Sequence, residues 1–396
     1  MPRIQPALNL NRHGHFMNKT LVAASAGFLI YCSHAAAQSS VTLFGVLDEG
    51  INYTSNVGGH ASWQTASGEL SVSRWGLRGT EDLGGGLNAV FDLESGFALD
   101  NGQTAYGGRL FGYQSYVGLQ SDRYGSLTFG RQFDSIADTV GLLTANGNWA
   151  GFLFSHPLDN DNTDATYHAS NSVKYTSPAW AGLTATALYG FSNQAGGFAN
   201  NRVFSAGVNY TWQTLTLAAV YEDLDAPGAN ASGSIANDDI GFAAQNQKTW
   251  GFGANYGIGP VTLGAVYTRA NVMQPSASIY VGDLGLGDHA SLKFDNFEIN
   301  ARYNLTPAVI LGGMYTYTRA SLDEDSGRSS LHWNQVGAMA QYLLSKRTSV
   351  YGQLVWQSVS GGNTGTPLDD ALIPGTAGAS SNSHQIVARL AINHTF

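Results

Sequence analysis

The sequence predicts an all-β fold, a 16-stranded antiparallel transmembrane β-barrel. From residue 41 on, apolar and polar residues alternate with a period of two, the pattern of strands with one apolar and one hydrated face. The connections between these segments are alternately short and long, as in a barrel of up-and-down strands. Residues 134–168 interrupt the alternation, and an interruption of that length inside a compact unit is expected to be functional or disordered.

The beginning of the chain has the form of a secretory signal peptide. Met17 opens a short polar region with one lysine, an apolar run follows at 21–31, and the small residues Ala35–Ala37 complete the three parts. We expect initiation at Met17, an extension at residues 1–16 and cleavage after Ala37, which leaves 38–396 as the barrel. A membrane-spanning helix is the weaker alternative, because the run is shorter than the ~20 apolar residues that a span requires.

Composition excludes several classes of protein. Residues 1–37 contain three of the 19 basic side chains, none of the 28 acidic ones and the only cysteine. The mature chain therefore has 16 basic and 28 acidic side chains, a formal charge of −12, and no cysteine. It lacks the basic face of a nucleic-acid-binding protein and cannot be a disulfide scaffold. No run of 18 apolar residues follows the leader, which argues against helical membrane spans.

Sixteen strands are predicted from the alternation. In residues 202–212, for example, Phe204 and Val208 share one face, and Ser205 and Asn209 share the other. The strands are expected at residues 41–54, 70–80, 87–99, 109–120, 126–133, 170–177, 183–193, 202–212, 214–224, 247–257, 261–272, 292–304, 308–320, 332–344, 348–360 and 384–396.

The connections favour a membrane barrel over a soluble β-sandwich or lectin. Seven short turns alternate with eight longer connections, as required when both termini lie at the short-turn end. Most strands reach ten or more residues, whereas sandwich strands are usually about 5 or 6 residues long. The long connections are expected at 55–69, 100–108, 134–169, 194–201, 225–246, 273–291, 321–331 and 361–383.

Aromatic residues and the last strand support a lipid-facing surface. In residues 384–396, Ile386 and Leu390 share the apolar face, so Arg389 turns to water, since an arginine in mid-membrane lipid would cost ~2–4 kcal/mol. Six aromatic residues next to short turns fit a girdle at the membrane interface. They are Trp180, Tyr210, Trp212, Tyr256, Tyr303 and Tyr342.

Three stretches carry a family resemblance that extends over the mature chain. They are SRWGLRGTEDLGGG at 73–86, YVGL at 116–119 leading into GSLTFGRQ at 125–132, and the terminal Phe396. They resemble the trimeric general-diffusion porins of Gram-negative outer membranes, especially those of β-proteobacteria. The resemblance implies an outer-membrane channel, surrounded by lipid and lipopolysaccharide, for passive diffusion of ions and small hydrophilic solutes. It implies neither catalysis nor a bound cofactor.

The resemblance also implies assembly properties. In these porins the C-terminal aromatic strand is recognised by the barrel-assembly machinery, so Phe396 is assigned a role in folding rather than in transport. A homotrimer is expected from the resemblance. Gly45 and Gly50 in the first strand would allow close packing between barrels, although glycine there also fits simple strand bending.

In these porins the third long loop folds inward and narrows the pore opposite a ladder of arginines. The resemblance therefore implies that residues 134–168 are a constriction loop folded into the lumen. Arg74 falls on a ladder position, and Arg78 follows on the same strand face. Tyr113 and His168 stand at two further ladder positions, and both depart from the family pattern.

The loop also departs from the family pattern. Asp138 keeps a family aspartate, but Thr144 and Asn148 stand where well-known members carry constriction acids. A basic ladder opposite an acidic loop creates a transverse field, so diluting both sides predicts modest charge selectivity, with its direction open. Arg131 is either a pore charge or a salt-bridged wall residue. Further lining candidates on polar strand faces are Glu298, Arg302 and Arg389.

A calcium site is weighed against a solvated acidic loop. Asp159, Asp161 and Asp164 are spaced like the first oxygen ligands of a calcium loop. The glycine expected at position six is replaced by Asp164, and the glutamate expected at position twelve is replaced by Ser170. The solvated loop is favoured, and no cofactor is expected.

Two other functions use the same barrel. An outer-membrane enzyme would need a nucleophile with an oriented histidine, and no partnered serine motif accompanies the candidates Asp288, His289 and His332. An enzyme or an adhesin is therefore less favoured. A substrate-specific channel would use an aromatic binding track, although two of its three residues could simply anchor the loop. The track candidates are Tyr113, Trp149 and Phe152.

Overall fold

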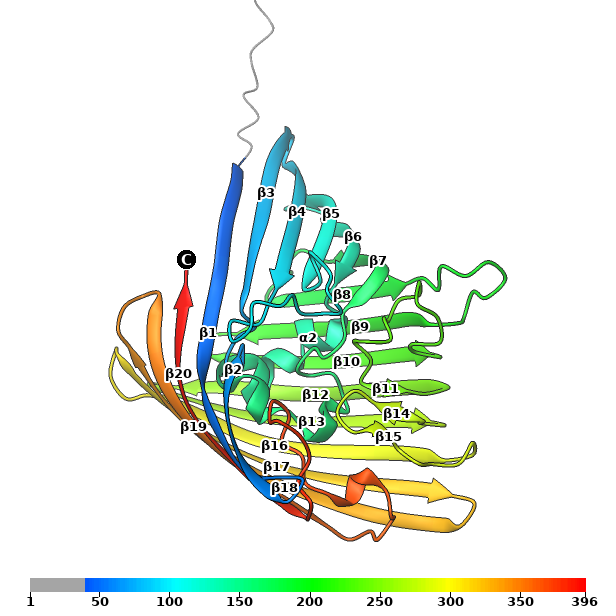
Figure 1. Cartoon of the computed structure of the whole chain (residues 1–396). Helices are drawn as coiled ribbons and strands as arrows, with labels where there is room; N and C mark the ends of the chain where they lie inside the picture. Colours follow the sequence, from blue (N-terminus) through cyan, green and yellow to red (C-terminus); the bar gives the residue numbers. More distant parts are fainter. Residues whose placement is uncertain (1–39) are drawn as a thin grey trace, which may run out of the picture. The chain divides into compact units, whose positions relative to one another are not determined.

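The computed structural model describes residues 40–396, which form a β-sheet curving around a lumen (Figure 1). The expected leader and its cleavage site after Ala37 lie outside the described residues. Within residues 40–396, no helix has both the length and the apolar character needed to cross a membrane. Strand pairing defines the architecture.

The sheet closes because its first and last strands pair. β1 (Ser40–Val57) and β20 (His384–Thr395) are antiparallel partners along residues 46–54 of β1. β2 (His60–Ser67) and β3 (Arg74–Gly84) both pair with β1 and form one wall strand interrupted at 68–73. The 17 strand segments of the sheet therefore give 16 wall strands. The predicted 16-stranded antiparallel barrel is confirmed.

The other wall strands follow in chain order, each antiparallel to its neighbours. They are β4 (Leu87–Gly96), β5 (Gln114–Ser121), β6 (Gly125–Gln132), β7 (Ala169–Thr176), β8 (Leu183–Gly190), β9 (Arg202–Trp212), β10 (Leu215–Asp225), β12 (Asn246–Ile258), β13 (Val261–Met273), β16 (Ser291–Asn304), β17 (Val309–Glu324), β18 (Gly327–Leu343) and β19 (Thr348–Ser360). A small second sheet in the long connections contains β11 (Phe242–Ala243), β14 (Ala277–Ser278) and β15 (Gly282–Asp283).

Two connections that the sequence predicts to be long are tight turns. Strands extend through most of 55–69 and 321–331, so only residues 58–59 and 325–326 separate the flanking strands. Gly58 and its neighbour have φ values of 57° and 97°, a conformation that favours glycine and allows a two-residue reversal. The prediction fails because the many polar residues near these turns obscure the alternation, although Leu322 and Leu331 are buried on the inner face.

Side-chain exposure follows the predicted alternation. On β20, Leu390 is 75% exposed on the outer face, whereas Arg389 is 1% exposed on the inner face. Phe204 and Val208 on β9 are likewise exposed, and Ser205 between them is buried. The outer surface is therefore apolar, and the inner surface is mainly polar.

The glycines in β1 make room for β20. A Cβ atom on Gly45 would lie 2.3 Å from the ring of Phe396, and one on Gly50 would lie 2.3 Å from Cβ of Ala391. The backbone N–H of Phe396 donates to the carbonyl oxygen of Gly45 over 3.0 Å. Contacts within one barrel thus account for both glycines, and they no longer support packing between barrels.

Part of the lumen is filled at the long-loop end. There, buried apolar side chains from β13, β16, β17, β18 and β19 pack against the connections 226–245, 274–290 and 361–383. Ala270, Phe294 and Trp333 are wall members of this cluster, and Leu284 and Leu372 come from the connections. Leu158 of the segment 134–168 belongs to the same cluster, so the lumen is packed on this side by the connections and the segment together.

Candidate pore and constriction

The segment 134–168 lies inside the barrel and bonds to inward-facing wall residues (Figure 1). It contains α2 (Ser135–Asp138) and the short helical turns η1 (Gly141–Leu143), η2 (Asn146–Ala150), η3 (Phe152–Phe154) and η4 (Pro157–Asp159). Three wall glutamines donate through Nε2 to its backbone carbonyls, satisfying acceptors that a buried loop cannot leave unpaired. The bonds are Gln353 to Ala150 (2.5 Å), Gln335 to Ser155 (3.0 Å) and Gln247 to Asn160 (3.0 Å).

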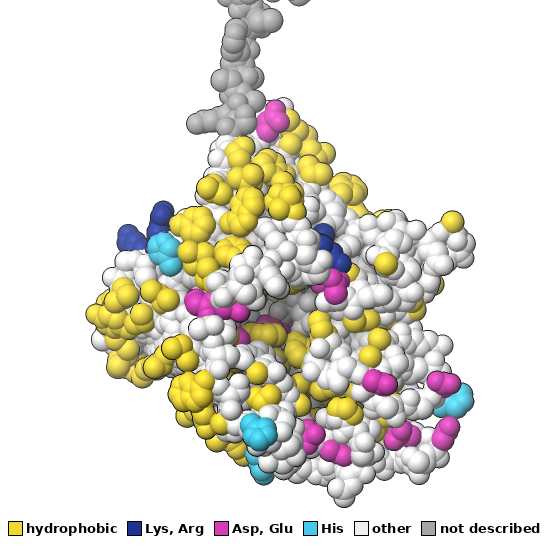
Figure 2. Space-filling model, viewed as in Figure 1, with side chains coloured by type: hydrophobic (Ala, Val, Ile, Leu, Met, Phe, Trp, Pro, Cys, Tyr) yellow, Lys and Arg dark blue, Asp and Glu magenta, His cyan; other side chains and the backbone are white. Residues whose placement is uncertain are grey.

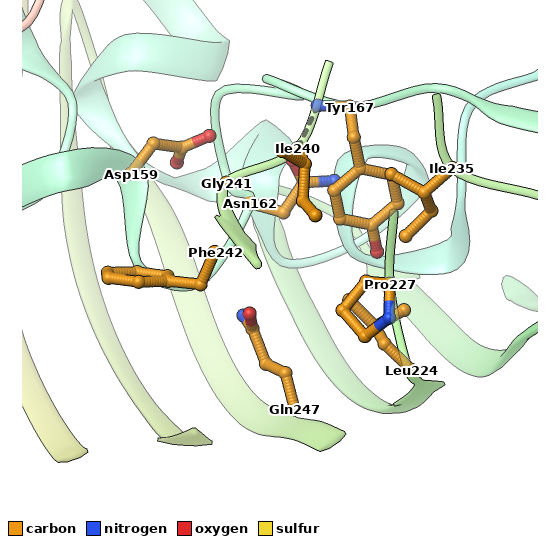
Figure 3. A pocket seen from close by; sticks show the side chains of 10 residues that line it. All are labelled: Asp159, Asn162, Tyr167, Leu224, Pro227, Ile235, Ile240, Gly241, Phe242 and Gln247. Atoms are coloured by element: carbon orange, nitrogen blue, oxygen red, sulfur yellow. Dashed lines mark hydrogen bonds between the residues drawn. The ribbon is translucent and has the colours of Figure 1, made fainter. Parts of the chain in front are cut away.

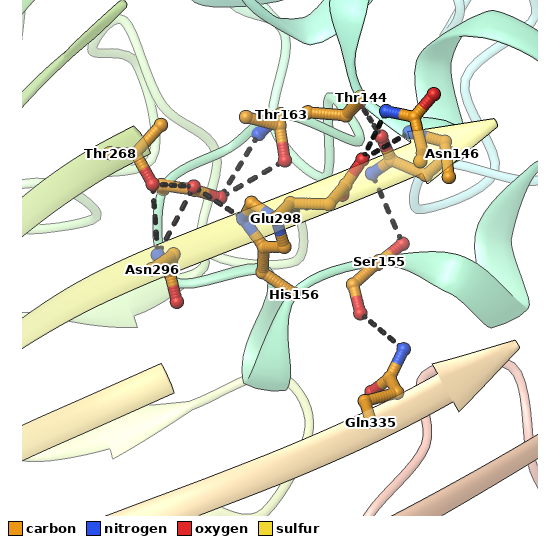
Figure 4. A network of polar contacts seen from close by, with 12 residues as sticks. Thr144, Asn146, Ser155, His156, Thr163, Thr268, Asn296, Glu298 and Gln335 are labelled. Carbon is orange, nitrogen blue, oxygen red and sulfur yellow. Dashed lines mark hydrogen bonds and ion pairs between the residues drawn. The ribbon is translucent and has the colours of Figure 1, made fainter. Parts of the chain in front are cut away.

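A buried charged cluster anchors the same segment, as shown in Figure 4. Nδ1 of His156 lies 2.7 Å from Asp161, and Nε2 lies 3.1 Å from Glu298 on β16. Glu298 also accepts the backbone N–H of Ala145 over 2.7 Å. Burial alone would lower the pKa of His156, but the charges and hydrogen bonds of both carboxylates outweigh it and raise the pKa to about 10. A protonated His156 therefore joins loop and wall.

Aromatic side chains of the segment fill notches in the wall. A Cβ atom on Gly312 would lie 2.2 Å from the ring of Trp149, and one on Gly337 would lie 2.3 Å from the ring of Phe154. Nε1 of Trp149 donates to Asn300 over 3.4 Å. These wall glycines permit a close approach that any larger residue would block.

The far end of the segment packs against the connection 226–245. Figure 3 shows Tyr167 beside Ile235 and Ile240, with Asp159 and Asn162 on the segment side. The space left there is only about 10 Å³, roughly the room for one water molecule. This contact is tight packing and offers no passage.

Three cavities follow one another along the opposite side of the lumen. The outer cavity, of about 860 Å³, lies among the long connections, and the middle one, of about 430 Å³, lies between the segment 134–168 and the wall. The inner cavity, of about 500 Å³, lies at the short-turn end. The outer and middle cavities share Phe133, Asp138 and Leu142, and the middle and inner cavities share Tyr116, Ser126 and Thr128.

An ion pair lies at the first of these junctions. Lys174 on β7 is paired with Asp138 and donates from Nζ to the carbonyl oxygen of Phe133 over 3.0 Å. Burial raises the pKa of Asp138, although Lys174 opposes the shift. The sequence analysis selected Asp138 and missed Lys174. The alternation of residues along β7 places Lys174 on the inner face, and this was the signal that could have found it.

Three of the predicted ladder positions come together. The guanidinium of Arg74 lies 4.7 Å from the centre of the Tyr113 ring, and its Nε donates to Glu94 over 2.5 Å. The ring of His168 lies 5.2 Å from that of Tyr113 and 4.8 Å from that of Phe133. Burial and the nearby arginines hold the pKa of His168 well below its usual value. This imidazole is therefore a neutral member of an aromatic cluster.

Two further arginines occupy different environments. Arg131 is buried, donates to the carbonyl oxygens of Gly112 (2.6 Å) and His168 (3.0 Å), and forms an ion pair with Asp239. Its contacts are those of a salt-bridged wall residue. Arg78 is exposed in the inner cavity, with its guanidinium 4.5 Å from the centre of the Phe44 ring.

Of the predicted lining residues, only Arg78, Tyr113 and Asp138 line one of the three cavities. Arg74, Arg131 and His168 do not, and neither do the other five. Thr144 is buried and donates to the carbonyl oxygen of Gly141 over 2.6 Å, and the exposed Asn148 donates to that of Leu142 over 3.2 Å. The remaining three are wall residues on the packed side of the lumen. They are Glu298 and Arg302 on β16 and Arg389 on β20.

Arg389 closes the barrel rather than facing the cavities. It is buried and lies 3.0 Å from Asp48, 2.8 Å from Asn52 and 2.9 Å from the hydroxyl of Tyr351. These contacts tie β20 to β1 and β19. Alternation predicted an inward side chain correctly, but it carries no information on what covers that side chain.

The acidic stretch has divergent partners. Asp159 accepts from the hydroxyl of Thr166 over 2.7 Å, whereas Asp161 is directed to His156 and to the hydroxyl of Thr268. Asp164 lines the outer cavity. Within residues 40–396, no group of three or more histidine, cysteine, aspartate or glutamate side chains is arranged to hold a metal ion.

The channel geometry agrees with comparisons to known proteins. Residues 20–362 match the Gram-negative porin family. An outer membrane porin protein of Bordetella pertussis is 36% identical over 377 residues, covering 85% of this chain and 93% of the relative. Two solved structures share the fold. They are an anion-selective porin from Comamonas acidovorans (22% identity, TM-score 0.68, 91% and 100% coverage) and the trimer form of OmpT of Vibrio cholerae (15% identity, TM-score 0.65, 90% and 99% coverage).

The family match spans most of the described barrel, and the Bordetella relative is aligned over most of both chains. The family resemblance stated from the sequence is thus confirmed. The closed barrel and the succession of cavities are what passive diffusion requires. The chain belongs to the Gram-negative porin family and is an outer-membrane channel for passive diffusion.

Proposed function

We propose that ions and small hydrophilic solutes cross the channel through the outer, middle and inner cavities in turn, and that selectivity is set where the outer cavity meets the middle one. The observation that carries this proposal is the Asp138–Lys174 ion pair at the junction lined by Phe133 and Leu142. Charges at a narrow point of a channel act on every ion that passes. The segment 134–168 is accordingly the constriction loop. No reaction is involved.

Single-channel recordings in a planar bilayer with a potassium chloride gradient test this proposal. Asp138→Asn leaves Lys174 unpaired in the passage and should move the reversal potential toward anion preference. Lys174→Gln should move it toward cation preference. Opposite shifts are expected because each variant removes one sign of charge from the same point.

Asp323→Asn and Arg328→Gln are matched controls, since these residues form an exposed ion pair beside the β17–β18 turn. They should leave the reversal potential unchanged. If the variants at Asp138 and Lys174 behave like these controls in folded protein, the selectivity point lies elsewhere.

We also propose a homotrimer, with Phe396 serving recognition by the barrel-assembly machinery and the apolar outer surface contacting lipid and lipopolysaccharide. Support comes from the trimer form of the Vibrio structure and from the exposed terminal ring, which is 42% accessible. Chemical cross-linking in native outer membranes should give a band of three subunits. Deleting Phe396 should reduce the folded protein in the membrane without reducing synthesis, and unchanged folding would remove the assembly role.

A further inference from the structure

The outer cavity has an unbalanced set of charges. Its lining includes five carboxylates and, among the described residues, no lysine, arginine or histidine. Three of the five form ion pairs with basic residues that do not line this cavity. The pairs are Asp138 with Lys174, Asp238 with Arg109 and Asp239 with Arg131. The other two, Glu69 and Asp164, have no basic partner within 4.0 Å in residues 40–396. Figure 2 shows the hollowed face with acidic side chains at its margin.

Glu69 is a buried carboxyl group with an unpaired oxygen atom. It is only 4% exposed, and its Oε2 has no hydrogen-bond partner. The residue lines the cavity, and its Oε2 is packed against Gly375, where a Cβ atom would lie 2.3 Å away. Burial raises the pKa of Glu69 to about 8, although the charge of Arg389 opposes the shift. The ionised carboxylate is therefore costly here, and a cation in the cavity would stabilise it.

Asp164 lines the same cavity as Glu69. Burial raises the pKa of Asp164 well above its usual value, and the charges of Asp159 and Glu69 raise it further. Burial also raises the pKa of Tyr280, and the charges of Asp159, Asp164 and Glu69 add to that shift. The charge of Glu69 therefore acts on Asp164 and on the hydroxyl of Tyr280, and all three residues line the same cavity.

Aromatic rings flank the two carboxylates. The backbone N–H of Phe152 donates to the carbonyl oxygen of Glu69 over 2.6 Å, and the ring of Phe152 lies 6.4 Å from that of Tyr280. The hydroxyl of Tyr280 bonds to Thr166 over 2.7 Å, which fixes this ring beside the loop. Both rings line the cavity together with the two carboxylates. Aromatic faces attract cations and also contact apolar groups.

We propose that the outer cavity is a binding site for organic cations, namely amines with an aromatic or alkyl body. The ammonium group is held between Glu69 and Asp164, and the body lies against Phe152 and Tyr280. A hydrated inorganic ion would use the carboxylates without the rings. This inference rests on the proposed diffusion path and adds a substrate class to it, with saturable passage as its consequence.

The test measures block of the potassium current by 2-phenylethylammonium added on the long-loop side of single channels. Block should rise with concentration and saturate. The neutral isostere 2-phenylethanol and the anion 3-phenylpropanoate should block little. Glu69→Gln and Asp164→Asn should each weaken block by about tenfold, the scale of one lost hydrogen bond to a charged group. Asp323→Asn, a matched change on the exposed rim, should leave it unchanged.

The outcomes separate the inference from the diffusion path. Normal potassium current with no block, with equal block by 2-phenylethanol, or with block unaffected by both variants overturns the site. Stronger block by magnesium ions than by 2-phenylethylammonium assigns the carboxylates to inorganic cations and overturns the proposed ligand class. Absence of current from folded protein would instead overturn the diffusion path itself. The potassium current of each variant serves as its own check that the channel has folded.

Discussion

The two halves of the lumen use inward-facing polar residues in opposite ways. In the packed half, lined by β12 to β20, such residues are covered by the loop 134–168 and by the long connections. Gln335, Glu298 and Arg389 there are buried and hydrogen-bonded. In the open half, lined by β3 to β9, residues such as Arg78 and Lys174 border the cavities. The packed half fixes the loop, and the open half is left for solutes.

This difference separates stability from selectivity. Charges in the packed half are desolvated, so removing one partner leaves the other uncompensated in a medium of low polarity. Charges in the open half meet water and salt, which screen them. Substitutions in the packed half should therefore change folding and loop position, whereas those in the open half should change ion preference.

The largest expected effect is that of Arg389→Ala. It leaves Asp48 buried without its ion-pair partner at the closure of β1 and β20, and it should lower the free energy of unfolding by about 3–5 kcal/mol. The measurement is the temperature at which the folded band is lost on gel electrophoresis in detergent. Arg347→Ala, the same change in an exposed turn, should shift that temperature little. Equal shifts would show that the buried pair does not hold the closure.

The second effect is release of the loop by His156→Ala. This variant places the carboxylates of Asp161 and Glu298 in the packed half without the cation between them. The loop can relieve that repulsion by leaving the wall, so the cost falls on loop position more than on barrel stability. We expect new protease cleavage within 134–168 and larger, noisier single-channel currents, with the folded band kept. Quiet currents of normal size would contradict the anchoring role.

Raising the pH of the unmodified channel should have the same effect as the substitution His156→Ala. Because the pKa of His156 is raised to about 10, the anchor is fully stabilised below the ordinary histidine value and is lost as pH rises through about 10. The pKa of Asp161 is lowered, although burial opposes this, by the charge and hydrogen bond of His156. Its contribution is therefore lost only in acid, below the ordinary aspartate range.

Current noise should consequently rise on the alkaline side of pH 10 in the unmodified channel. In His156→Ala the noise should already be high and should not rise further in that range. A rise of the same size in both proteins would assign the alkaline effect to other groups.

A smaller effect is expected from filling one of the wall notches. Gly337→Ala brings a methyl group against the ring of Phe154, and overpacking of this kind typically costs about 1–3 kcal/mol. The loop should move toward the open half and reduce conductance. Gly313→Ala is the matched control, because its nearest neighbour is a backbone oxygen at 4.0 Å. An equal conductance in the two variants would show that the notch does not position the loop.

The sequence predicted the wall well because its signal is local. Alternation at residues such as Phe204 and Ser205 reports which face meets lipid, and it requires no knowledge of distant contacts. It also predicted where the loop lies along the chain. The two turns at 58–59 and 325–326 were missed because polar residues next to them obscure the alternation of the flanking strands.

The candidate site was predicted only in part, for a physical reason. An inward-facing charge becomes an anchor or a lining residue according to what covers it, and that depends on contacts more than a hundred residues apart, such as Glu298 with Ala145. The resemblance led to Asp138, Arg74 and Tyr113, which do lie near the first cavity junction. Lys174 and Glu69 match no motif, and only the fold brings them to the cavities.

The smallest expected effect is that of Arg78→Gln, in the open half. Arg78 is exposed in the inner cavity and has an aromatic contact with Phe44, an interaction that contributes roughly 0.5–1 kcal/mol at exposed sites. Stability should hardly change, and the reversal potential should move slightly toward cations. The shift should be clear at low salt and vanish near 1 M salt, where the screening length falls to about 3 Å. A shift that persisted in 1 M salt would place Arg78 in a desolvated setting and remove the contrast between the halves, because screening by solution ions is the property that distinguishes the open half from the packed one.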